Sequence, residues 1–136
     1  MTTIRRTVAL GIAALSLLGV ASLAFAQDDI LEANVPFPFH INSMTFPAGQ
    51  YEMRIDWADR RVTVIGGQHA PAIELFVTTL APSPHTTATD AHVVFDKVGT
   101  TYTLSELWAP NVDGILLHAT EGKHEHEVLH VHHGRD

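Results

Sequence analysis

The chain has 136 residues with fifteen acidic and eight basic side chains, and it contains no cysteine. A disulfide and a cysteine nucleophile are therefore excluded. The formal net charge of −7 argues against nucleic acid as a partner, because phosphates call for a basic surface. It also argues against docking on anionic lipid by charge alone.

The first 26 residues are typical of a cleavable secretory signal peptide. Arg5 and Arg6 form a basic head, residues 8–23 form an apolar run, and residues 24–26 (Ala-Phe-Ala) form a small-x-small cleavage site. The apolar run is short for a spanning helix of roughly 20 residues. We therefore expect a signal helix that is cleaved after Ala26, no membrane span in the mature chain, and an exported protein in the periplasm or outside the cell. The arginine pair leaves both the Sec and the twin-arginine routes open.

The mature chain, residues 27–136, has the size of a single domain with a modest core. Cleavage removes two basic residues and no acidic one, which leaves six basic and fifteen acidic residues, a net charge of −9 with neutral histidines. Stability must come from burial and β pairing. Ten histidines are present, and their protonation below roughly pH 6.5 would move the net charge towards zero.

The clearest predicted strand is residues 51–57, where apolar and charged side chains alternate without a break. A turn rich in Pro and Gly precedes it at residues 46–50. Residues 58–60 then separate it from residues 61–65. This spacing predicts a hairpin, whose second strand ends at Gly66-Gly67.

Further strands are predicted on both sides of this hairpin. The two prolines in residues 35–39 indicate an edge strand or an entry segment. Residues 73–80 are apolar on both faces in places and predict a central strand, followed by a loop at 82–90. Residues 92–97 and 101–108 predict a second hairpin. The whole predicts an all-β fold, an antiparallel β-sandwich or small barrel of about seven or eight short strands.

Three of these segments together resemble a known group of sequences. Val35-Pro36-Phe37-Pro38-Phe39 precedes the residues 46–51 (FPAGQY), and Val94-Phe95 precedes residues 99–108 (GTTYTLSELW). This VPFxF … PAGxY … VF…G…YxLxxxW order resembles a group of uncharacterised small exported β-rich proteins of soil bacteria. The resemblance covers roughly residues 33–110 and implies an exported β-rich fold, with no known activity and no site residues to carry over.

The aromatic side chains in these segments are expected to pack in the core or on a sheet face. Trp57 and Trp108 have an alternative, which is an exposed aromatic platform for a sugar.

The C-terminal segment, residues 118–136, holds six of the ten histidines, with acidic residues between them. Imidazole is the commonest protein ligand for Zn, Cu and Ni, and carboxylates can complete the coordination shell. The histidines are His118, His124, His126, His130, His132 and His133.

On a strand, residues two apart share a face at a spacing of about 6.5–7 Å. This places His124, His126, His130 and His132 on one face, where each His-x-His pair can bind one divalent ion. Residues 120–123 would form the turn back from the strand that begins at residues 115–118. His118 would join the same face in one hairpin register and not in the other.

Two alternatives remain open for these histidines. In one, the chain is a structural or interaction module of the cell envelope, with an envelope or extracellular partner, and the histidines only make a solvated surface. In the other they form a pH-responsive surface, since histidine changes charge between pH 5 and 8.

Residues 126–130 (HEVLH) also match the H-E-x-x-H pattern of zinc metalloproteases, in which a helix places two histidines on one ion. The β-branched Val128 and Val131 favour a strand instead, and little chain follows to provide a third ligand. No other catalytic constellation stands out. We therefore expect a non-enzymatic exported protein that binds a divalent transition metal through its histidine-rich C-terminal strand.

Overall fold

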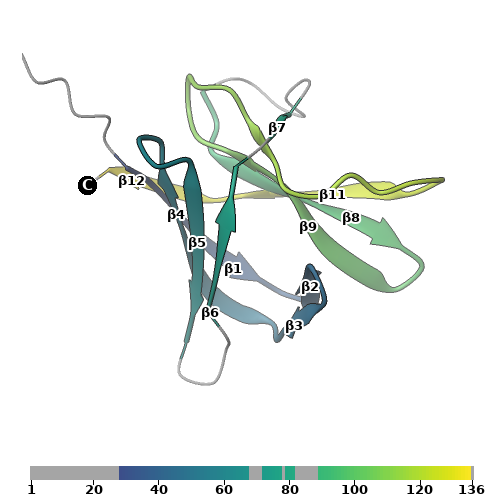
Figure 1. Ribbon diagram of the computed structural model, residues 1–136. Coiled ribbons are helices and arrows are strands. Elements are labelled where there is room, and N and C mark those ends of the chain that lie inside the picture. Colours follow the sequence, from purple (N-terminus) through teal and green to yellow (C-terminus); the bar gives the residue numbers. More distant parts are fainter. Residues whose placement is uncertain (1–27, 68–71, 78, 82–88, 136) are drawn as a thin grey trace, which may run out of the picture.

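A computed structural model describes residues 28–67, 72–77, 79–81 and 89–135 of the chain (Figure 1). The predicted signal helix and its cleavage site lie outside these residues, as does most of the predicted loop at 82–90. The described part is all-β, with twelve strands in two sheets and no helix. It follows that no helix within it is long and apolar enough to cross a membrane. The predicted fold class is confirmed, although the strands are shorter and more numerous than expected.

The first sheet, sheet A, is antiparallel throughout and contains the clearest predicted hairpin. Its strand order is β12-β1-β4-β5-β6. The strands are β1 (Asp29–Val35), β4 (Gly49–Asp56), β5 (Arg61–Gly66), β6 (Ala72–Phe76) and β12 (His132–Arg135). The β4–β5 hairpin pairs Asp56 with Arg61, as the alternating sequence predicted, and Arg60 in its turn has a φ of 53°.

The second sheet, sheet B, is mixed. Its main order is β11-β8-β9-β10-β7, and β2 pairs with β3 and, in parallel, with β9. The strands are β2 (Phe39–Ile41), β3 (Met44–Phe46), β7 (Thr79–Leu80), β8 (His92–Val98), β9 (Thr101–Trp108), β10 (Ile115–Leu116) and β11 (Glu125–His130). The predicted second hairpin is confirmed as β8–β9. The strands of the two sheets run in clearly different directions (Figure 1).

One hydrophobic core joins the two sheets, with Leu31 and Met53 from sheet A and Phe39 and Phe95 from sheet B. The rings of Phe39 and Phe95 meet edge to face with centroids 5.2 Å apart, a geometry that aromatic pairs favour. Phe95 and Val93 on β8 belong to this core, so the residues that alternate with them point to the outer face of sheet B. That outer face carries the candidate site.

The structure contradicts one expectation from the sequence and decides between two alternatives for another segment. The run at 73–80 is not a central strand: β6 is an edge of sheet A and β7 an edge of sheet B. Its side chains are alternately exposed and half-buried along β6, because only one face of this edge strand packs against the core. For the proline segment at 35–39, the structure excludes the edge strand, since β1 lies inside sheet A. It agrees with the alternative of an entry segment, since Pro36–Pro38 lead from β1 into β2.

The C-terminal segment is also arranged differently from the predicted single strand with a turn at 120–123. β10 pairs with β9 while β11 pairs with β8, so β10 and β11 lie on opposite sides of the β8–β9 hairpin. The connection between them must cross that hairpin, and it begins with bonds from the amides of Leu117 and His118 to the carbonyl of Ser105. After β11 the chain passes at Val131 into sheet A as β12.

The pH dependence of folding stability tests whether the phenol of Tyr51 is buried in the core. Its hydroxyl donates to the carbonyl of Pro47, and burial raises the pKa of Tyr51 above its ordinary value of about 10. As the pH rises through about 10, the Tyr51 phenol ionises in the unfolded chain before it ionises in the folded protein. The folded state therefore loses stability relative to the unfolded state until the pH reaches the raised pKa. We expect the stability advantage of the wild type over Tyr51→Phe to shrink between about pH 8 and about pH 11 in urea unfolding. A difference that stays constant with pH would contradict the burial of this phenol.

Candidate metal site

Asp96 is the acidic centre of the site, on the outer face of β8. Only 2% of its surface is exposed, and a buried carboxylate requires partners that compensate for lost hydration. The β8–β11 register places His126 directly opposite Asp96. Residues opposite each other on antiparallel strands share a face, so this pairing brings an imidazole to the carboxylate from 30 positions further along the chain.

His124 joins them from the end of the crossing connection, two residues before His126. The Nδ1 atom of His126 lies 3.0 Å from Oδ1 of Asp96, and Nε2 of His124 lies 3.9 Å from Oδ2. The two imidazole rings meet nearly at right angles, with centroids 4.9 Å apart. Each of the three residues has a ligand atom within 4.8 Å of those of the other two, so the group could hold a metal ion.

The tautomer of His124 follows from its local turn. Its Nδ1 lies 2.9 Å from the carbonyl oxygen of Gly122, and Gly122 adopts a φ of 82° that suits glycine. A carbonyl can only accept, so Nδ1 carries the proton and donates. The lone pair of the neutral ring is then on Nε2, the atom that faces Asp96. Second-shell bonds of this kind fix the tautomer and orientation of metal-binding histidines.

The 3.9 Å separation between Nε2 of His124 and Oδ2 of Asp96 is too long for a hydrogen bond. It is close to the distance between two ligands of one ion: bonds of about 2.0–2.2 Å at a tetrahedral angle place ligand atoms about 3.4 Å apart. A shift of about half an ångström would therefore close the site on a cation. Nδ1 of His126 faces the carboxylate and donates to it at 3.0 Å in the metal-free protein. A metal ion held by this group would take the place of that proton.

The structure brings together two of the five predicted metal ligands, His124 and His126. His130 shares their face but lies opposite His92, about 13 Å along the strand from His126. His132 begins β12 and pairs with Glu32 in sheet A, so the expectation that one strand face carries it with the others is wrong. His118 is exposed, and its carbonyl accepts from the hydroxyl of Ser105 at 2.8 Å.

The H-E-x-x-H segment forms most of β11. On a strand, His126 and His130 are separated by about 13 Å, whereas the zinc-protease mechanism needs them one helical turn apart. The two histidines therefore lie too far apart to bind one zinc ion in the way that this motif does.

Sequence reasoning missed Asp96, which is the acidic member of the group. The signal for it was present: Asp96 follows Val93, Val94 and Phe95 in a strand with an apolar centre, and a lone carboxylate in such a strand needs a partner. The histidine spacing alone could not identify that partner, because the contact depends on the register of β8 with β11.

For Trp57 and Trp108 the sequence leaves open the alternative of an exposed aromatic platform for a sugar. Trp108 is buried, stacks on the ring of His92 at 5.6 Å and donates to Glu106. Gly114 lies against it, so close that a side chain at this position would collide with the indole. Trp108 therefore cannot serve as an exposed platform, whereas Trp57 is only partly buried.

No protein-family model, curated protein or solved structure matches this chain. The interpretation of the site consequently rests on its own geometry.

Proposed function

We propose that this chain is an exported, non-enzymatic protein that binds one divalent transition metal ion through Asp96, His124 and His126. The observation that carries the proposal is the buried Asp96 carboxylate, on which two imidazoles converge, one from β11 and one from the connection that precedes it. Two imidazoles and a carboxylate suit Zn, Cu or Ni, and the chain contains no thiolate that would favour a softer ion.

Support for export comes from the signal-like residues 1–26, and the resemblance to small exported proteins of soil bacteria agrees with it. We place the protein in the periplasm or outside the cell. Three protein ligands would leave at least one coordination position for water or a further ligand. That arrangement suits an ion that is taken up and released rather than one that only holds the fold.

The test is a calorimetric titration of the exported form with Zn(II), Cu(II) and Ni(II). We expect one ion per chain with a sub-micromolar Kd, and affinity reduced at least about 100-fold in His124→Ala and in His126→Ala. Binding should weaken between about pH 7.5 and about pH 5.5, because protons compete with the metal for the same ring nitrogens.

Matched controls come from the same segment. His130→Ala removes a histidine from the same face of β11, and His132→Ala removes one from β12, but neither belongs to the group. Both should bind metal within about twofold of the wild type. Equal losses in all four variants would instead indicate diffuse binding along the histidine-rich segment, and would overturn the three-residue site.

A second candidate function, an envelope interaction module, is favoured by one observation. Phe76 is 71% exposed on β6, the edge strand of sheet A, and exposed apolar side chains at a sheet edge mark interaction surfaces. This reading predicts that Phe76→Ser abolishes pull-down of an envelope protein while the four histidine variants do not.

A further inference from the structure

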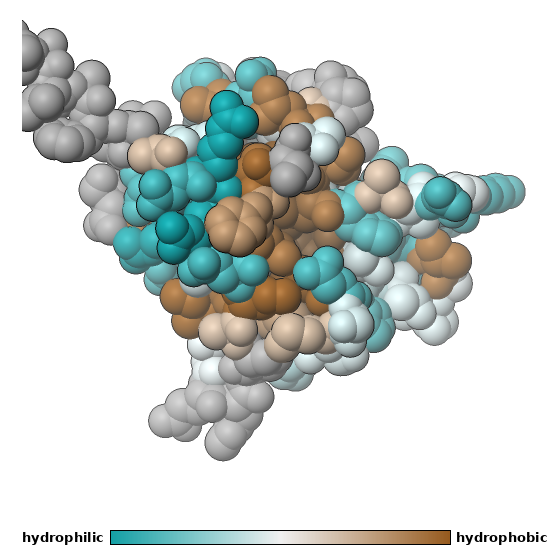
Figure 2. Space-filling model, in the orientation of Figure 1, coloured by the Kyte–Doolittle hydropathy of each residue, from teal (hydrophilic) through white to brown (hydrophobic). Residues whose placement is uncertain are grey.

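A small cavity lies where an edge of sheet A approaches an edge of sheet B, away from the metal group. It measures about 250 Å³ and is lined by Trp57 and Arg60 from the β4–β5 turn, and by Val77, Thr79 and Leu80 around β7. Figure 2 shows apolar surface gathered in a hollow near the centre of this view of the molecule. The cavity is smaller than the roughly 300–1,000 Å³ of pockets for drug-sized ligands, so its occupant must be small.

The Trp57 wall is held in place by buried polar contacts. The indole Nε1 of Trp57 donates to Oδ2 of Asp29 at 2.6 Å, and Oδ1 of the same carboxylate lies 2.7 Å from Nε2 of His133. Asp29 is itself buried. Because β1 and β12 thus fix the orientation of the ring, one side of the cavity is preorganised, which lowers the entropy lost on binding.

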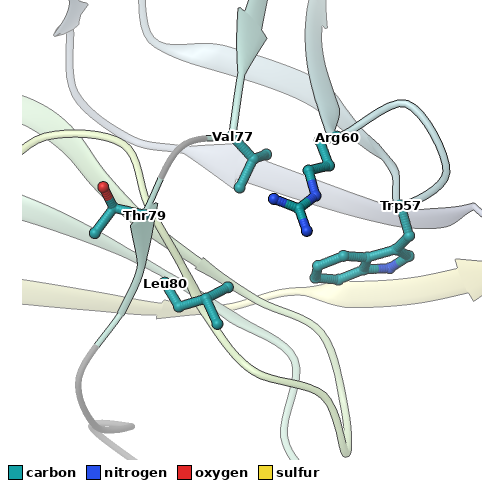
Figure 3. A pocket seen from close by; sticks show the side chains of 5 residues that line it. All are labelled: Trp57, Arg60, Val77, Thr79 and Leu80. Carbon is teal, nitrogen blue, oxygen red and sulfur yellow. The ribbon is translucent and has the colours of Figure 1, made fainter.

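A main-chain hydrogen bond joins the two segments that carry Arg60 and Val77. The amide of Val77 donates to the carbonyl of Arg60 at 2.8 Å, which joins the segment after β6 to the β4–β5 turn. In Figure 3 the Arg60 guanidinium extends into the space between the Trp57 ring and the side chains of Val77 and Leu80. A single cation is thereby placed among apolar walls.

Charge identifies the kind of molecule that fits. In this acidic chain, nearby arginines have acidic partners: Arg54 pairs with Glu52, and Arg61 pairs with Asp59 and Glu74. None of the ion pairs among the described residues includes Arg60. A guanidinium pairs best with a carboxylate or phosphate. The limited volume and the apolar walls favour a carboxylate with a short apolar body.

We propose that this cavity binds a small monocarboxylic acid, with its carboxylate on the Arg60 guanidinium and its apolar chain against Trp57, Val77 and Leu80. The site is independent of the metal group, which lies on the outer face of sheet B. Among the described lining residues Thr79 also carries a hydroxyl, which Figure 3 shows turned away from the Arg60 guanidinium, so the carboxylate is assigned to Arg60 alone.

The test uses hexanoate as the probe, with 1-hexanol and hexylammonium as neutral and cationic probes of the same length. Calorimetry on the exported form should show saturable hexanoate binding. Hexanol should bind at least about tenfold more weakly, because it lacks the charge-assisted bond, and hexylammonium should not bind. Hexanol that binds as tightly as hexanoate, or hexanoate that does not bind, would overturn the proposal.

Variants of the lining residues test whether hexanoate binds in this cavity. Arg60→Gln lies in an exposed turn, so the fold should persist, and hexanoate affinity should fall at least about tenfold. Arg54→Gln, which removes an ion-paired arginine of β4, should leave it within about twofold. Leu80→Trp, which fills the cavity from an exposed position, should block binding. Unchanged affinity in Arg60→Gln or in Leu80→Trp would overturn the assignment.

Discussion

Replacing Phe95 with alanine should destabilise the protein by about 3–5 kcal/mol, the usual cost of removing a large buried ring. Phe95 has no exposed surface, and its ring packs edge to face against Phe37 at 5.0 Å and Phe39 at 5.2 Å. A domain of this size has about 5–15 kcal/mol of total stability, so the variant should retain only part of it. Urea unfolding followed by tryptophan fluorescence measures the difference.

The matched control for this prediction is Phe76→Ala. Phe76 is 71% exposed on the edge strand β6, so the same substitution should change the free energy of unfolding by no more than about 0.5 kcal/mol. Similar values for the two variants would show that Phe95 is not in the centre of the core. Because Asp96 follows Phe95 directly, a misplaced β8 would also remove the basis of the metal site.

Asp96→Asn should reduce metal affinity at least about 100-fold while it leaves the metal-free fold nearly unchanged. Asparagine has the same shape, and its carbonyl oxygen can still accept the bond from Nδ1 of His126. What it loses is the negative charge, which attracts a divalent cation more strongly than a neutral oxygen does. The metal-free free energy of unfolding should therefore change by no more than about 1.5 kcal/mol.

Urea unfolding with and without metal separates the loss of metal affinity from any change in the stability of the metal-free fold. At a free zinc concentration of 100 times Kd, the wild type should gain about 2.7 kcal/mol of stability by mass action. Asp96→Asn should gain almost nothing at the same concentration, and His130→Ala should gain as much as the wild type. Equal stabilisation of the wild type and Asp96→Asn would place the bound ion elsewhere.

The local strand signals in the sequence were reliable where one face of a strand is buried. Tyr51, Met53 and Ile55 alternate with polar residues and are buried along β4, and the hairpins β4–β5 and β8–β9 follow from the turns between their strands. The prediction of a central strand failed at residues 73–80, because apolar side chains on both faces carry no information on which sheet a strand joins. Sheet membership depends on contacts between residues that are far apart in the chain.

The candidate site shows the same limit. The spacing of His124 and His126 predicted a shared face, and the structure gives the two rings a common neighbour. The expected extension to His130 and His132 required one continuous strand, whereas the chain changes sheets at Val131 to pair with β1. The contribution of Asp96 depends on the β8–β11 register, which pairs it with His126, 30 positions further along the chain, and is not encoded in a local motif.

The most direct test of the metal proposal is to locate the ion itself. Crystals of the exported form grown with zinc, with data collected on both sides of the zinc absorption edge, give its position by anomalous scattering. The proposal predicts one dominant peak about 2.0–2.2 Å from Nε2 of His124 and from a carboxylate oxygen of Asp96, with His126 as the third protein ligand. A dominant peak at His130, His132 or His133, or no peak under saturating zinc, would contradict it.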